Sequence, residues 1–101
     1  MNNFDNIRAW AAARHLIAGS TPQAQMLKLF EEGGELAAAI ARGKHAESED
    51  AIGDMAVVLT ILAAQMGMQI EDCIEAAWQE IKDRKGRMVD GVFVRELKLT
   101  P

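Results

Sequence analysis

Apolar residues recur at helical spacing in four stretches, and short polar links separate them. The first stretch stops at Gly19. Thr21 and Pro22 then mark the start of a second helix, because threonine caps helices and proline suits the first helical position. This second helix is predicted to end at about Arg42, before Gly43. The recurring positions are Ile7, Trp10, Ala11, Arg14 and Ile17 in the first helix, and Met26, Leu29, Phe30, Leu36 and Ile40 in the second.

A third helix is predicted from a cap at Ser48 to near Gly67. Its body, residues 55–62, is apolar nearly all round, which favours a central helix covered on several sides, by this chain or by another subunit. A fourth helix is predicted over about 70–84. It should bury an apolar face made of Ile70, Ile74, Ala77, Trp78 and Ile81.

Residues 88–94 place an Asp-Gly turn between two short β-prone segments, which is typical of a hairpin. The sequence contains no internal repeat and no low-complexity linker. We therefore predict an all-α fold, four helices arranged much like a bundle, with a short C-terminal β-hairpin or extended tail. Residues 1–101 should form a single domain.

Composition narrows the classes of function. A formal charge of -4 argues against broad nucleic-acid binding. The longest apolar run, 55–64, is too short to span a bilayer, for which about 20 residues are needed. Cys73 has no partner for an internal disulfide, and the N-terminus lacks the pattern of a secretion signal. We therefore expect a cytoplasmic protein that binds neither nucleic acid stably nor a membrane.

Acidic residues form two clusters inside otherwise apolar helical stretches. Glu31, Glu32 and Glu35 lie in the second predicted helix, and Asp50 and Asp54 open the third. Residues three or four apart share a helix face, so antiparallel packing would bring these carboxylates to one place. Their repulsion would cost stability unless a divalent cation neutralised it. The clusters therefore favour a metal site.

Gly33 and Gly34 interrupt the second helix beside these acids, at a cost of about 1 kcal/mol each relative to alanine. Close packing of two helices would explain them. Room for a ligand beside the carboxylates would explain them equally well, and the two explanations are compatible.

These residues resemble the all-α nucleoside triphosphate pyrophosphohydrolases of the MazG type, and most closely the short proteins of phages and bacteria. The resemblance rests on the pattern Glu-Glu-x-x-Glu at 31–35 and on Gly53-Asp54 opening an apolar helix. It implies that Glu32, Glu35 and Asp54 bind Mg²⁺, with Mn²⁺ as an alternative. This sequence departs from the family pattern at Ala51, where the family commonly has glutamate.

Asp50 is the nearest acid to the missing ligand, and it lies four residues before Asp54 on the same face. A shorter carboxylate there could reach the metal, directly or through water. Otherwise the chain would hold one magnesium where the family pattern provides for two, or would complete its site only with oxygens of the nucleotide.

The resemblance implies hydrolysis of a nucleoside triphosphate, or its deoxy form, to the monophosphate and pyrophosphate. Glu31 or Glu32 is a candidate to orient or deprotonate the attacking water. Hard carboxylate oxygens suit magnesium, whereas the sequence lacks the Glu-x-x-His pair or Cys/His cluster of a di-iron or zinc site.

Four further residues are candidates for contact with the substrate. Lys82 and Lys85 could reach the phosphates, or could simply complement the C-terminal end of the fourth helix dipole. Trp10 could stack on the base with Arg14 beside it, or could be a core residue.

We expect a homodimer or a homotetramer, because four helices are few to enclose a nucleotide. A different class of function stays open because of Ala51: a helical dimerisation module, or a regulatory nucleotide-binding module, with a degenerate metal site and no catalysis.

Overall fold

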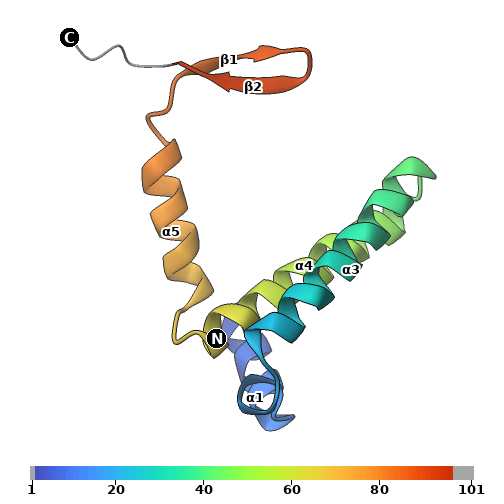
Figure 1. The fold of residues 1–101 in the computed structure, drawn as a ribbon, viewed down its shortest axis with the longest axis vertical. Coiled ribbons are helices and arrows are strands. Elements are labelled where there is room, and N and C mark those ends of the chain that lie inside the picture. The colour runs from blue at the N-terminus through green and yellow to red at the C-terminus, as the bar shows by residue number, and fades with distance from the viewer. Residues whose placement is uncertain (1, 97–101) are drawn as a thin grey trace. The chain divides into compact units, whose positions relative to one another are not determined.

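The computed structural model describes residues 2–96, which form five helices and one antiparallel hairpin (Figure 1). The elements are α1 (Asn3–Ala13), α2 (Leu16–Gly19), α3 (Pro22–Ala41), α4 (His45–Gln65), α5 (Ile70–Ile81), β1 (Gly86–Val89) and β2 (Val92–Arg95). The predicted all-α fold class with a C-terminal hairpin is confirmed. The chain divides into two compact units, one ending at Glu71 and one beginning at Asp72, and each is described by itself.

The first unit is built around α3 and α4, which lie side by side and are joined by a tight turn at Gly43 (Figure 1). Gly43 has a positive φ of 66°, a conformation that glycine adopts without strain. Thr21 caps α3 as predicted, since its hydroxyl oxygen accepts a 3.1 Å hydrogen bond from the Ala24 N–H, and Pro22 is the first helical residue.

The predicted cap at Ser48 is wrong. α4 begins earlier, at His45, after the extended residue Lys44. The Ser48 hydroxyl instead donates to the Lys44 carbonyl at 2.9 Å from inside the first turn.

The single N-terminal helix predicted to run to Gly19 is divided in the structure. His15 adopts a left-handed conformation with φ 60°, which ends α1 and starts the short α2. The amide of Gln65 in α4 donates to the Leu16 carbonyl at 3.2 Å and so ties α2 to the end of α4.

Small residues dominate the core of the first unit. Among residues 2–96, four of the six buried hydrophobic residues are alanines, and these six are Ala11, Ala39, Ala51, Val58, Ile61 and Ala63. Thr60 is fully buried, and its hydroxyl donates to the Ala56 carbonyl of the same helix at 2.7 Å. A core of small side chains brings helices close together but buries little apolar surface per residue.

Several positions predicted to be buried are exposed in the single chain. Phe30 and Ile40 of α3 are 71% and 63% exposed. Within the 55–62 body of α4, Val58, Thr60 and Ile61 are buried and Leu59 is 38% exposed, while Ile52 and Met66 on either side of it are each 58% exposed. Within the second unit, Ile74, Trp78 and Ile81 of α5 are each about half exposed. Helical periodicity marks an apolar face correctly, but it does not state what covers that face.

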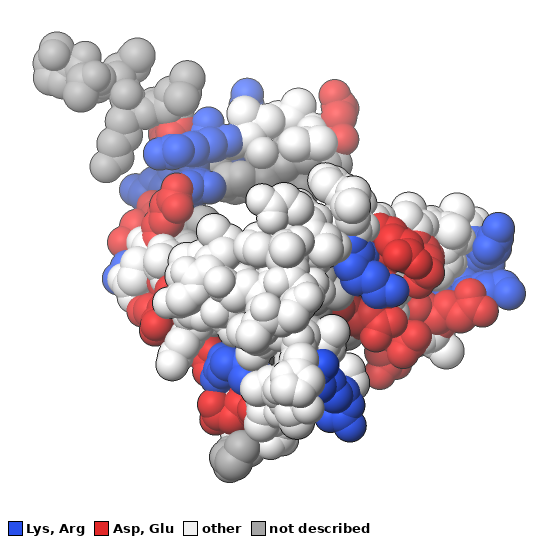
Figure 2. Space-filling model, turned by 60° about the horizontal axis from the view of Figure 1, so that its bottom comes forward, with Lys and Arg blue, Asp and Glu red and all other residues white. Residues whose placement is uncertain are grey.

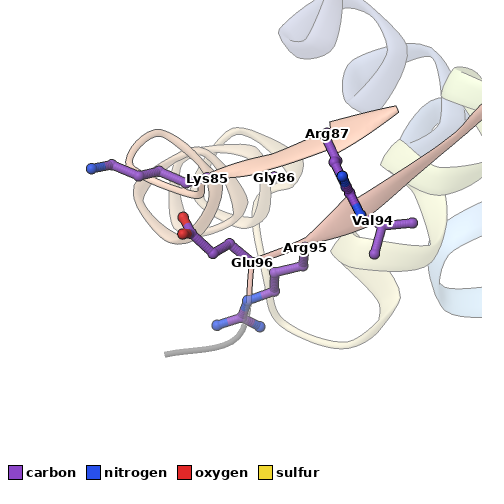
Figure 3. A pocket seen from close by; sticks show the side chains of 6 residues that line it. All are labelled: Lys85, Gly86, Arg87, Val94, Arg95 and Glu96. Atoms are coloured by element: carbon purple, nitrogen blue, oxygen red, sulfur yellow. The ribbon is translucent and has the colours of Figure 1, made fainter. Parts of the chain in front are cut away.

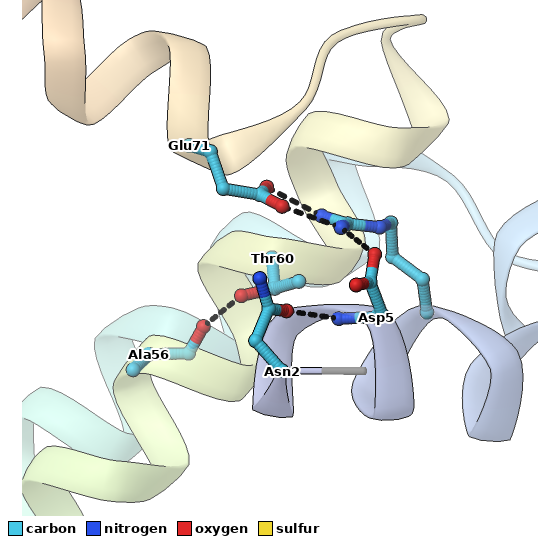
Figure 4. A network of polar contacts seen from close by, with 6 residues as sticks. Asn2, Asp5, Ala56, Thr60 and Glu71 are labelled. Carbon is cyan, nitrogen blue, oxygen red and sulfur yellow. Dashed lines mark hydrogen bonds and ion pairs between the residues drawn. The ribbon is translucent and has the colours of Figure 1, made fainter.

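Arg8 forms the main ionic network of the first unit. Its guanidinium donates to both oxygens of Glu71 at 2.6 Å and to Asp5 at 2.7 Å. Figure 4 shows the Asp5 and Glu71 carboxylates meeting it, with Asn2 capping α1 nearby. The pKa of the Glu71 carboxyl is lowered by this hydrogen bond. The network joins α1 to the first turn of α5.

The second unit contains the rest of α5 and the hairpin. The predicted Asp-Gly turn is confirmed, since Asp90 and Gly91 have φ values of 49° and 80°, as a type I′ turn requires. The strands pair in the register Gly86 with Arg95 through Val89 with Val92. α5 ends at Ile81, three residues before the predicted end.

Within residues 2–96, no single helix is both long and apolar enough to cross a membrane, and α4 and α5 pass that test only when counted together.

The two predicted caps provide a direct test of the helix boundaries. Thr21→Ala removes a real cap and should lower the free energy of unfolding by about 1 kcal/mol. Ser48→Ala is the matched control and should change it by less than about 0.5 kcal/mol, because its hydroxyl caps nothing. Urea denaturation of both variants measures the difference. Equal losses would show that α4 begins at Ser48 after all.

Candidate metal centre

Glu32 is the centre of the acidic region. It lies on the side of α3 that faces α4, and its side chain is only 7% exposed. One carboxylate oxygen, Oε1, is 3.2 Å from the Lys28 ammonium, while the buried Oε2 has no hydrogen-bond partner among the described residues. A buried carboxylate oxygen without a donor is costly, so this atom is the natural position for a cation.

Glu35 and Asp54 lie beside Glu32, one on each helix. The pKa of Glu35 is raised above its ordinary value, first because its protonated carboxyl can donate a hydrogen bond to the Glu32 carboxyl, and then by the charge of that group. The pKa of Asp54 is raised by partial burial first, and then by the charges of Asp50 and Glu32. Both shifts reflect the proximity of acidic groups on α3 and α4.

Lys28 is the site residue that sequence analysis missed. Its ammonium is 3.2 Å from Glu32 and 3.7 Å from Glu31, and these two carboxylates raise its pKa. The spacing of three and four residues was the available signal, since such pairs face each other on a helix. Lys28 partly neutralises the acids in the absence of metal.

The remaining positions of the predicted metal site differ in how much of each side chain is exposed to solvent. Asp50 is exposed, although its charge is felt by Asp54. Ala51, where the resemblance leads one to expect a glutamate, is 4% exposed and packs in the core. Glu31 points outward, with its side chain 59% exposed. Asp50 is therefore exposed to solvent. It does not replace the glutamate expected at position 51, because Ala51 occupies that buried position.

The carboxylates do not form a ready coordination shell. Among the residues that the structure describes, no group of three acidic, histidine or cysteine side chains is arranged to hold a metal ion. The chemistry of the donors nevertheless fits a hard divalent cation, because they are all carboxylate oxygens and Glu32 Oε2 is available. Figure 2 shows a group of acidic side chains with basic side chains at its edges.

The predicted substrate-contacting residues lie in both units. Trp10 is 48% exposed within the first unit, and the Arg14 guanidinium lies over its ring, 4.5 Å from the centroid. Lys82 and Lys85 are exposed and belong to the second unit. The structure places neither lysine relative to the carboxylates.

Residues 20–89 match the family model of the MazG nucleotide pyrophosphohydrolase domain, and the chain belongs to this family. The match spans both acidic clusters, α5 and the start of the hairpin.

One phage protein is similar in sequence. It is described as an uncharacterised 18.2 kDa protein of the rep-hol intergenic region of Haemophilus phage HP1, and it is 50% identical over 60 residues. The aligned region is 59% of this chain and 37% of that protein, so the chain matches well under half of its relative's length. No solved structure matches the chain.

The raised pKa values predict how stability depends on pH. Because folding raises the pKa of Glu35 and Asp54 above 4.5 and 3.8, the metal-free folded chain holds these protons more tightly than the unfolded chain. This stabilisation is present below the ordinary values and is lost as pH rises through the folded-state values. Metal-free Glu35→Gln should therefore melt higher than wild type at pH 7, with a smaller difference at pH 4.

The matched control is Glu49→Gln, an exposed acid of α4 for which we expect little change in melting temperature at either pH. Scanning calorimetry in EDTA measures all three proteins. A lower melting temperature of Glu35→Gln at pH 7 would contradict the idea that Glu35 is repelled by its neighbours.

Proposed function

We propose that the chain is a magnesium-dependent pyrophosphohydrolase that cleaves a nucleoside triphosphate, or its deoxy form, to the monophosphate and pyrophosphate. The observation that carries the proposal is the buried, unpartnered Oε2 of Glu32 between Glu35 and Asp54. Membership of the MazG family supports the same class of reaction.

Glu32, Glu35 and Asp54 are the residues that would hold Mg²⁺, or Mn²⁺ in its place, with Asp50 as an outer partner. The bound metal would supply positive charge for the pyrophosphate leaving group. Glu31 is exposed and next to the site, which suits a residue that orients or accepts a proton from the attacking water. Lys28 would lose its ion pair with Glu32 when the metal enters, and would then be free to face a phosphate oxygen.

A regulatory module without catalysis remains the second candidate, and the burial of Ala51 favours it. An alanine at that depth removes a ligand that no neighbour replaces from the same position. A site with fewer carboxylates could still bind a nucleotide with its metal, yet turn it over slowly or not at all.

The reaction is tested by incubating the protein with Mg²⁺ and a panel of ribonucleoside and deoxyribonucleoside triphosphates, and by measuring pyrophosphate and orthophosphate separately. We expect pyrophosphate without orthophosphate. Glu35→Gln should lower the rate by at least about 100-fold, because the remaining carboxylates must hold the metal alone. Glu49→Gln should keep the wild-type rate. Orthophosphate as the sole product would contradict cleavage between the α- and β-phosphates.

Metal binding without turnover would support the regulatory module. Mg²⁺ at ten times its Kd should raise the free energy of unfolding of the wild-type chain by about 1.4 kcal/mol, whether or not any substrate is cleaved. The same addition should leave Glu35→Gln nearly unchanged. A wild-type chain that does not respond to Mg²⁺ would contradict the pyrophosphohydrolase proposal and would favour a helical dimerisation or regulatory module whose degenerate site holds no metal.

We further propose that the chain works as a homodimer or homotetramer. Leu27 and Phe30 on α3 are 72% and 71% exposed, and Ile52 on α4 is 58% exposed. Gly34 lies on the same helix with no heavy atom within 4 Å of the position its Cβ would take, so contacts within the described chain do not explain this glycine. A second copy packed closely against α3 would cover the large side chains and use the space at Gly34.

The assembly is tested by Phe30→Glu, which should shift the protein to monomer in sedimentation velocity runs at micromolar concentration. A charge in a buried apolar interface is costly to desolvate. Gln23→Glu, an exposed position in the first turn of the same helix, is the control and should keep the wild-type mass. A monomeric wild-type protein would contradict this proposal and leave the metal site unaffected.

A further inference from the structure

Lys28 lies at the edge of the acidic region of the first unit. Its ammonium is 3.2 Å from Oε1 of Glu32 and 3.7 Å from Oε2 of Glu31. The lysine side chain is 48% exposed, whereas the side chain of Glu32 is 7% exposed. The ion pair therefore joins a buried carboxylate to a cation on a flexible stem, which can move into solvent without disturbing the packing of α3.

The charge of Lys28 also acts on the other two proposed metal ligands. The hydrogen bond to Glu32 raises the pKa of Glu35, and burial raises the pKa of Asp54, while the Lys28 ammonium opposes both shifts. The lysine and a bound metal would thus relieve the repulsion among the same three carboxylates. Two cations that neutralise the same carboxylates compete, because each reduces the negative charge that attracts the other.

The basic side chains of the hairpin are arranged differently. Lys85, Arg87 and Arg95 line a hollow there, but their charged ends point apart (Figure 3). Lys28 instead contacts a buried carboxylate of the proposed metal site, so its charge bears directly on what that site binds.

We infer that Lys28 is a displaceable counterion, which makes the carboxylate site bind a magnesium–triphosphate complex in preference to magnesium alone. In the metal-free chain the ammonium stays on Glu32 and weakens the attraction of the carboxylates for a free cation. Phosphate oxygens that arrive with the metal give the ammonium a new partner and so remove the competition. The inference rests on the proposed function for the identity of the metal and of the phosphate ligand.

This order of binding suits the chemistry of the metal. Mg²⁺ is commonly held by one or two protein carboxylates together with the phosphates of a substrate. Ala51 leaves this chain without the glutamate that the family resemblance leads one to expect, so oxygens from the nucleotide matter more here. A lysine that discourages the free cation and accepts a phosphate would make filling of the site depend on the nucleotide.

The test compares Lys28→Gln with the wild-type chain by isothermal titration, first with Mg²⁺ alone and then with tripolyphosphate in saturating Mg²⁺. Lys28→Gln should bind Mg²⁺ about three- to tenfold more tightly, because a competing charge is removed. It should bind magnesium tripolyphosphate about three- to tenfold more weakly, because the partner of a phosphate oxygen is lost. Glutamine matches lysine in helix propensity, so the variant should keep α3.

Lys44→Gln is the matched control. Lys44 is also an exposed lysine, and its ammonium is 3.6 Å from Glu47, an acid outside the proposed metal site. The variant makes the same change in net charge and should bind both probes like wild type. Lys28→Arg keeps the charge at position 28 and should restore the weak binding of Mg²⁺ alone.

The opposite signs of the two effects are the signature of a displaced counterion. Weaker binding of both probes to Lys28→Gln would overturn the inference, because Lys28 would then only position Glu32. Unchanged binding of Mg²⁺ alone would overturn it, and so would tighter binding of both probes. Equal gains in Mg²⁺ affinity for Lys28→Gln and Lys44→Gln would overturn it by assigning the effect to net charge. A wild-type chain that does not bind magnesium tripolyphosphate would overturn it as well.

These binding measurements do not depend on turnover. If Lys28→Gln shows the two opposite effects but the wild-type chain cleaves no triphosphate, the proposed function fails and the role of Lys28 stands. If the wild-type chain cleaves a triphosphate and Lys28→Gln binds Mg²⁺ like wild type, the role of Lys28 fails alone.

Discussion

The contact between α3 and α4 at Glu32 is the constraint on which the rest of the site depends. Packing the two helices through small residues brings them close and buries this carboxylate. The same approach places Glu35 and Asp54 near it, and their raised pKa values report the resulting repulsion. Lys28 relieves only part of that repulsion, through Oε1, and leaves Oε2 without a donor. The fold thus stores an electrostatic cost that a divalent cation would remove.

Acidic and basic side chains are concentrated in different parts of the chain. The first unit carries the acidic site, while the hairpin carries cations that are not paired within the described residues. Each considered within its own unit, α3, α4 and α5 also leave large hydrophobic side chains exposed.

Much of the fold could be predicted from local signals. Thr21 and Pro22 mark the start of α3 by capping chemistry, and the Asp90-Gly91 turn identifies the hairpin, because each signal acts within a few residues. The break at His15 could not be predicted, since no glycine or proline marks it. The early start of α4 could not be predicted either, because no side chain caps the helix at Lys44. Which apolar side chains are buried could not be predicted either. Phe30 and Ile52 belong to apolar patterns, yet the single chain leaves them exposed.

For the site, the sequence by itself determined which acids share a helix face, because helical spacing fixes the direction of Glu32 relative to Glu35 on one helix and of Asp50 relative to Asp54 on the next. The family resemblance added that Ala51 stands where a glutamate is common. Only the tertiary structure decided that Glu32 is the buried member, that Lys28 pairs with it, and that Ala51 is in the core while Asp50 is not. The reason is physical: burial and electrostatic environment arise when α3 meets α4, and neither is a property of one helix alone.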